Sequence, residues 1–213
     1  MAAPVEGLRE RKKRATREAI AAAARALFAE RGFDDVTVAE VAEAANVSTA
    51  TVFNYFPTKE DLLYSRFEAF EEELLSAVRD RAVGESVLDA FGRFIIDRSR
   101  RGAGRDLGER VKVTARIISD SPALLAREQQ IVARYSDALA ELIAEETNAK
   151  PDDLRPRVAA GALMSVHRAL IDFARRRARS GRGLARLAAD LEVEGERALA
   201  LLRDGLGDYA VKR

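Results

Sequence analysis

The stretch Asn46–Leu63, NVSTATVFNYFPTKEDLL, decides the fold because it contains two helix starts and one helix stop. Its centre is rich in Val, Thr, Phe and Tyr, which are residue types that favour strands. Ser48, however, is a residue type that caps the N-terminus of a helix, and Pro57 ends a helix because it lacks a backbone N–H. These signals predict a short helix over about 49–55 rather than a strand, and Thr58 then caps the next helix.

The residues before Asn46 predict another short helix, joined to the first by a tight turn. Thr37 and Glu40 have the spacing of a capping box, and residues 38–45 follow with one apolar face. Asn46 tolerates the left-handed backbone conformation that is needed when a helix ends and restarts within about three residues. Two short helices joined in this way form a helix-turn-helix pattern.

The rest of the chain also has helical periodicity. It contains no sustained alternation of apolar and polar residues, and Ala, Leu, Glu and Arg, which favour helices, are abundant. A first helix is expected over Thr16–Arg31, ended by Gly32. Further helices are predicted over residues 59–81, 86–100, 107–119, 122–146, 152–179 and 184–203. The expected fold is therefore all-α, with about nine helices.

Two regions are expected within this helical chain. Residues 1–58 form a small three-helix unit that carries the helix-turn-helix, and residues 59–213 form a larger helical bundle. The predicted helix over 59–81 joins the two without a flexible linker, so a movement of the bundle would be passed on rigidly. The 213 residues are enough to bury a sizeable core.

The composition excludes several classes of protein. The chain has no cysteine, which excludes a disulfide framework, thiolate catalysis and a cysteine-based zinc site. Its longest apolar run, Ala19–Ala29, is interrupted by Arg25 and is shorter than the roughly 20 residues that a membrane-spanning helix needs. The N-terminus has no secretory signal. A cytoplasmic protein with no membrane partner is therefore expected.

The charges are unevenly distributed although the net charge is only +1. Between residues 9 and 17 a single acid, Glu10, is accompanied by the basic residues Arg9, Arg11, Lys12, Lys13, Arg14 and Arg17. Such a basic N-terminal arm indicates a polyanionic partner, and the alternative is a solvated, disordered tail.

Residues Thr16–Leu63 resemble the DNA-binding domain of the TetR family of bacterial transcriptional regulators. The resemblance extends to the spacing of Phe28, Gly32, Thr37, Val41, Ala42, Val47, Ser48, Thr51, Tyr55, Phe56, Lys59 and Leu62. The sequence departs from the family at Asn46, where Gly is usual, at Thr49, where Lys is common, and over 53–55, where Tyr-Tyr-His is frequent. Because the last two departures alter side chains that face DNA, the operator preference cannot be carried over.

The resemblance implies an all-helical homodimer. The last two long helices, predicted over 152–179 and 184–203, would form the dimer interface. A cavity among the helices of residues 59–146 would take an unidentified small molecule, and its binding would loosen the grip on DNA.

The helix over 49–55 is expected to act as the recognition helix, which reads base edges in the major groove. Val52, Phe53 and Phe56 are expected to face the core, whereas Asn54 can bind adenine through two hydrogen bonds. Tyr55 is expected to bond a phosphate, as are the helix starts at 37 and 59. The basic arm can follow the DNA backbone or enter the minor groove. The expected DNA-facing residues are Arg11, Lys12, Lys13, Arg14, Thr37, Ser48, Thr49, Ala50, Thr51, Asn54, Tyr55 and Lys59.

Candidates for the lining of the ligand pocket are Phe91, Phe94, Ile95, Arg116, Ser119 and His167. Two of these candidates have a simpler alternative: a cluster such as Phe91, Phe94 and Ile95 is more often plain core than a ligand site, and His167 is more often a core or interface histidine. One histidine without cysteine cannot form the usual zinc sites. No catalytic residue, metal or cofactor is expected.

These features predict a sequence-specific, ligand-responsive transcriptional regulator. It would act as a homodimeric repressor that a small molecule releases from a pseudo-palindromic operator in double-stranded DNA. Two alternatives stay open, an all-α enzyme and a helical protein-interaction scaffold that binds no small-molecule effector.

Overall fold

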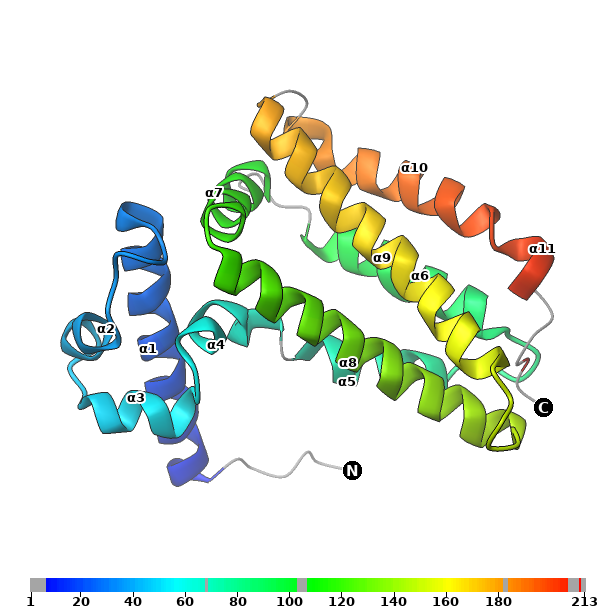
Figure 1. The fold of residues 1–213 in the computed structure, drawn as a ribbon, viewed down its shortest axis with the longest axis horizontal. Helices are drawn as coiled ribbons and strands as arrows, with labels where there is room; N and C mark the ends of the chain where they lie inside the picture. Colours follow the sequence, from blue (N-terminus) through cyan, green and yellow to red (C-terminus); the bar gives the residue numbers. More distant parts are fainter. Residues whose placement is uncertain (1–6, 68, 103–106, 182–183, 207–210, 212–213) are drawn as a thin grey trace. The chain divides into compact units, whose positions relative to one another are not determined.

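The computed structural model describes residues 7–67, 69–102, 107–181, 184–206 and 211. All regular elements in these residues are helical, which confirms the predicted all-α class (Figure 1). The α-helices are α1 (Leu8–Arg31), α2 (Val38–Ala44), α3 (Thr49–Tyr55), α4 (Lys59–Tyr64), α5 (Ala69–Arg79), α6 (Val87–Gly102), α7 (Leu107–Ser119), α8 (Pro122–Thr147), α9 (Arg155–Ser180), α10 (Leu187–Ala200) and α11 (Arg203–Leu206), with 3-10 turns η1 (Ser65–Phe67) and η2 (Leu184–Arg186).

The chain divides into two compact units, each with its own core. The first unit comprises Met1–Glu68 together with Ile117–Leu125, and the second comprises Ala69–Arg116 together with Ala126–Arg213. Helix α4 therefore belongs to the first unit, and so does the corner where α7 ends and α8 begins. We call residues 117–125 the α7–α8 corner.

The core of the first unit is formed where α2 and α4 pack against α1 and α3 packs against α2 (Figure 1). Its fully buried members include Ile20, Phe28, Val41, Phe56 and Leu62. The corner adds Ile117, Ile118 and Leu124, which are also buried. The buried hydroxyl of Tyr64 donates a 2.9 Å hydrogen bond to the carbonyl oxygen of Leu124, so the corner is an integral part of this unit.

The helix caps and the left-handed turn residue that the sequence predicts are present in the structure. Thr37 and Glu40 form a reciprocal capping box at the start of α2, and Thr58 and Asp61 form another at the start of α4. Asn46, between α2 and α3, has a left-handed backbone with φ of 53°.

Two predicted helices differ from the structure in their bounds. Helix α1 begins at Leu8 instead of Thr16, because residues 8–15 are mostly strong helix formers. The hydroxyl of Thr16 donates to the carbonyl of Lys12 within the helix (3.0 Å) and does not cap it. The last long helix, expected as one element over 184–203, is divided into η2, α10 and α11.

The predicted helix over 59–81 is also interrupted. Helix α4 ends at Tyr64 and is followed by the 3-10 turn η1, in which Ser65 donates its hydroxyl to the carbonyl of Leu62 (3.3 Å). Such a side-chain bond to the backbone competes with regular helix geometry. The expected rigid rod between the two regions is therefore replaced by two helices, α4 in the first unit and α5 in the second.

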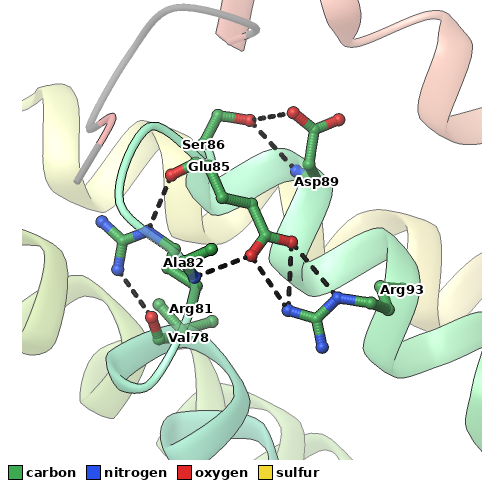
Figure 2. A network of polar contacts seen from close by, with 7 residues as sticks. All are labelled: Val78, Arg81, Ala82, Glu85, Ser86, Asp89 and Arg93. Atoms are coloured by element: carbon green, nitrogen blue, oxygen red, sulfur yellow. Dashed lines mark hydrogen bonds and ion pairs between the residues drawn. The ribbon is translucent and has the colours of Figure 1, made fainter.

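The second unit has α6 packed against α5, α9 and α10. The turn between α5 and α6 is held by Arg81, whose buried guanidinium donates to the carbonyls of Val78 (2.6 Å) and Glu85 (3.1 Å) (Figure 2). Arg81 also pairs with Glu146 at 2.6 Å, and Glu85 accepts from Arg93. Because a buried arginine needs such partners, this network fixes where α6 begins.

Candidate nucleic-acid interface

Helix α3 is short and both of its ends are defined. The side-chain oxygen of Ser48 accepts a 3.1 Å hydrogen bond from the backbone N–H of Thr51, which is the N-cap contact expected from the sequence. Phe56 ends the helix with an extended backbone. Val52 and Phe56 are each 1% exposed, so they attach α3 to the core of the first unit.

The exposed side of α3 follows from helix geometry. Successive residues are about 100° apart around a helix, so Thr49, Phe53, Ala50 and Asn54 occupy neighbouring positions in an arc of about 140°. All four are exposed. We call these four residues the exposed arc of α3. Thr51 and Tyr55, which were also expected to face DNA, are half-buried on the flank of the helix.

The prediction that Phe53 faces the core is wrong. Its side chain is 47% exposed, and it lies near the middle of the exposed arc, beside Ala50. The inward direction is already occupied by Val52 and Phe56, and the guanidinium of Arg17 lies 4.7 Å from the ring centroid of Phe56. A helix of two turns has room for one inward stripe, so the third apolar side chain points outward.

The start of α2 is stabilised by charge as well as by its cap. Glu40 accepts a 2.7 Å bond from the backbone N–H of Thr37 and pairs with Arg31 at 2.7 Å. The hydrogen bond from Thr37 and the contacts with Arg31 lower the pKa of Glu40 from 4.5 to about 2. These contacts fix the end of α1 against the first turn of α2.

Lys59, at the first position of α4, is folded back on the loop between α1 and α2. Its Nζ lies 4.3 Å from the ring centroid of Phe33 and donates to the carbonyl oxygen of Asp34 at 3.5 Å. The ammonium group therefore has a defined position at the N-terminus of α4.

The basic segment is helical. Arg11, Lys12, Lys13 and Arg14 lie in the first turns of α1, and all four side chains are exposed. Residues 7–15 bury no side chain, which is unusual for the end of a long helix and leaves a cationic helical extension next to the folded unit. The interpretation of this segment as a disordered tail is wrong for residues 8–14.

The structure brings together only some of the predicted pocket residues. Phe91, Phe94 and Ile95 are buried on α6. Phe94 and His167 both contact the ring of Phe70, with centroid distances of 5.4 and 4.5 Å. Arg116 is exposed and Ser119 is half-buried, and Ser119 belongs to the first unit, whereas the other five belong to the second.

The ring of Phe70 is the centre of an aromatic cluster that sequence reasoning missed. Tyr135 stacks on it at 5.1 Å and the guanidinium of Arg98 lies 5.1 Å from its centroid. Burial, followed by the positive charge of Arg98, lowers the pKa of His167 to about 4, so this histidine is neutral at pH 7. No sequence spacing links these residues, because they come from α5, α6, α8 and α9.

The described residues give little support for a metal site, a membrane-spanning helix or the predicted ligand pocket. Across the described ranges, no three histidine or acidic side chains are grouped to hold a metal ion. No helix in the described part of the chain has the length and apolar character to cross a membrane. An open groove of about 260 Å³ between α8 and α9 is lined by residues that include Ser136, Met164 and Arg168, and none of the six predicted pocket residues lines it.

Two family models match the chain. The model described as bacterial regulatory proteins of the tetR family matches residues 20–65, and the model described as the MftR C-terminal domain matches residues 85–206. The chain is 33% identical to the HTH-type transcriptional regulator TcmR of Streptomyces glaucescens over 168 residues, which are 76% of this chain and 74% of TcmR.

Solved structures share the fold at low sequence identity. NalD, the secondary repressor of the MexAB-OprM multidrug efflux pump in Pseudomonas aeruginosa, is 22% identical, with a TM-score of 0.58 over 92% of this chain and 97% of NalD. The SmeT–triclosan complex, whose protein comes from Stenotrophomonas maltophilia, is 20% identical, with a TM-score of 0.59 over 92% of this chain and 94% of SmeT. The family models, TcmR and the helix-turn-helix together identify the chain as a member of the TetR family of bacterial regulatory proteins, a DNA-binding transcriptional regulator.

Proposed function

We propose that this regulator is a homodimeric repressor that leaves its operator when a small molecule binds the second unit. The observation that carries the proposal is the α7–α8 corner. Helices α7 and α8 belong mainly to the second unit, yet the residues where they meet are packed into the DNA-binding unit. A ligand that shifts either helix therefore acts directly on the unit that carries α3.

The corner is attached to the first unit by two kinds of contact. Ile117, Ile118 and Leu124 are buried in its core, and Ser121 donates a 3.0 Å hydrogen bond to the carboxylate of Asp34. Asp34 lies in the loop between α1 and α2, just before the helix-turn-helix. For release to occur, the ligand must bind the DNA-competent and released conformations with different affinity.

The relatives support a role in repression with a small-molecule effector. NalD is described as a repressor of a multidrug efflux pump, and SmeT forms a complex with triclosan. The aromatic cluster around Phe70 has a composition that suits an apolar ligand, and the effector itself stays unidentified. By this proposal residues 1–58, together with Lys59 at the start of α4, bind DNA, and the rest of residues 59–213 bind the effector and the partner subunit.

On DNA, α3 enters the major groove with its exposed arc against the base edges. Asn54, at one edge of the arc, can accept from and donate to an adenine. Lys59 has three donors and uses one on Asp34, which leaves two for a phosphate. Ser48, Thr51 and Tyr55, on the cap and flank of α3, and Thr37, at the start of α2, contact the backbone.

The basic extension of α1 follows the DNA backbone by this proposal. Residues 8–14 are helical, and a helix with side chains is about 10–12 Å wide, whereas the minor groove is about 6 Å wide. Insertion of this segment into the minor groove is therefore excluded while it remains helical. Its exposed side chains can instead pair with successive phosphates.

The dimer forms through α9 and α10, which pack against each other in the second unit. Both helices expose faces of small and apolar residues that a partner could cover. These residues are Val158, Gly161, Ser165 and Ala169 on α9, and Ala189, Val193 and Ala200 on α10. Association of two such helix pairs gives a four-helix interface with two-fold symmetry, which matches a pseudo-palindromic operator.

The proposal can be tested with the purified full-length protein. Electrophoretic mobility shifts with genomic fragments at two salt concentrations should yield specific complexes that survive at the higher salt. Small molecules released from the protein and identified by mass spectrometry should weaken these complexes when they are added back. Complexes that are unaffected by a molecule that does bind the protein would contradict release by an effector.

A further inference from the structure

We propose that Phe53 and Ala50 form an apolar reading surface for thymine, which they recognise through the 5-methyl group in the major groove. This inference rests on the proposed function and adds to it one element of the operator: each half-site contains a thymine that is read by Phe53. It was not expected from the sequence, which predicts that Phe53 lies in the core.

The first observation is the position of Phe53. On the exposed arc of α3, Ala50 and Phe53 lie in the middle, and the polar side chains of Thr49 and Asn54 lie at the two edges. The centre of the surface that faces the base edges is therefore apolar. Phe53 is 47% exposed, and none of the ring contacts found in the described residues involves it.

The second observation is chemical. Phenylalanine has no group that can donate or accept a conventional hydrogen bond, so Phe53 cannot bond a phosphate or the polar edge of a base. The thymine methyl is the apolar group that the base pairs present in the major groove, and both alanine and phenylalanine are suited to contact it. Removing the exposed ring from water on binding is favourable in proportion to the apolar area that is covered.

Asn54, the residue after Phe53, makes the predicted sequence of the half-site more specific. Asn54 follows Phe53 directly and lies about 100° further around the helix, so the two side chains address adjacent parts of the groove. Because Asn54 is suited to adenine, the half-site should contain a thymine close to an adenine that Asn54 contacts. Thr49, on the other side of Phe53, can extend the same contact with its own methyl group.

The test replaces single thymines by uracil, which removes one methyl group and leaves every hydrogen-bonding group in place. The operator is first selected from random DNA with the wild-type protein. Each thymine of one half-site is then replaced in turn, and the dissociation constant is measured at fixed salt. We expect one replacement to weaken binding about fourfold, which corresponds to the burial of one methyl-sized group.

The same scan with Phe53→Ala assigns the effect to this side chain. Phe53→Ala should weaken binding to the normal operator, and it should be insensitive to the uracil replacement that affects the wild type. Phe53→Leu keeps apolar bulk and should retain part of the methyl effect. Val83→Ala is the matched control, because Val83 is an exposed apolar residue (77%) in the turn between α5 and α6, and it should behave as the wild type.

The outcomes separate this inference from the proposed function. If an operator is selected but no uracil replacement matters, or if Phe53→Ala shows the same methyl effect as the wild type, the inference is overturned and the regulator remains. If no sequence is selected at all, both are overturned. Should Phe53→Ala fail to fold, as judged by its thermal unfolding, the comparison of the wild type with Phe53→Leu decides.

Discussion

The hydroxyl of Ser121 donates a 3.0 Å hydrogen bond to the carboxylate of Asp34, and this bond joins residues that are 87 positions apart. Ser121 is buried at the α7–α8 corner, and Asp34 lies in the loop between α1 and α2. The same corner accepts the hydrogen bond from Tyr64 at the carbonyl of Leu124. The corner is thus bonded both to the entrance of the helix-turn-helix and to the helix that follows it.

Ser121→Ala removes the hydrogen bond to Asp34 and should weaken the transmission of ligand binding to DNA. We expect the free energy of unfolding to fall by about 1 kcal/mol, the usual net value of one such bond. The change in operator affinity that a bound effector causes should also shrink. Asp34→Asn is the control, since its amide oxygen can still accept from Ser121. An unchanged effector response in Ser121→Ala would show that the coupling runs elsewhere.

Replacement of Arg11, Lys12, Lys13 and Arg14 by Gln should weaken binding to all DNA sequences alike. Each lost phosphate contact lowers the slope of log Kd against log salt by about 0.9, so a reduction of about 2–4 is expected if most of these residues contact the backbone. The slope is measured between roughly 50 and 200 mM salt. The control is the double variant Arg176→Gln with Arg179→Gln, which removes exposed charges at the end of α9. It should leave the slope of log Kd against log salt unchanged.

Glu40→Gln should reduce the acid sensitivity of the first unit. The pKa of Glu40 is lowered from 4.5 to about 2 in the folded state, so its contribution to stability is fully present above pH 4.5 and is lost as the pH falls toward 2. In the variant, the stability should therefore decline less steeply in this pH window. Circular dichroism during acid titration measures the difference.

Glu43→Gln is the control for this titration, because Glu43 is an exposed glutamate on the same helix. It should retain the wild-type acid profile. Identical profiles for Glu40→Gln and the wild type would mean that the contacts of Glu40 with Thr37 and Arg31 do not stabilise the folded state in solution.

Val193→Asp should impair dimerisation. Val193 is 45% exposed on α10, and an aspartate there would bring two like charges into the proposed interface and desolvate them. Sedimentation at micromolar concentration should then show a shift toward monomer, with weaker operator binding as a consequence. Val83→Asp places the same charge on an exposed site in the turn between α5 and α6 and should remain dimeric. If the Val193→Asp variant stays dimeric and binds the operator with unaltered affinity, this face of α10 is not the dimer interface.

The sequence predicted those parts of the site that depend on local chemistry. Thr37 and Ser48 are helix caps, and Asn46 has the left-handed backbone, because each signal acts within a few residues. The direction of Phe53 could not be predicted in the same way. Three apolar residues on a two-turn helix allow more than one choice of inward stripe, and only packing in the core of the first unit selects Val52 and Phe56.

Contacts between distant segments were also beyond local reasoning. The bond from Ser121 to Asp34 and the stacking of His167 on Phe70 join different helices, and no periodicity relates their positions. The break between α4 and α5 was missed because the apolar stripe of residues 59–81 continues through it. Periodicity reports which face is apolar and does not report whether the helix is continuous.

Selection of operator DNA from a random pool by the full-length protein tests most directly whether this regulator reads a specific DNA sequence as a dimer. We expect enrichment of a pseudo-palindrome whose half-sites are about 34–36 Å apart, one turn of DNA or a multiple of it. Selection with Asn54→Ala should lose the preference for one adenine in each half-site. Enrichment of no sequence, or binding that is governed by salt alone and is equal for all sequences, would show that the protein is not a sequence-specific regulator.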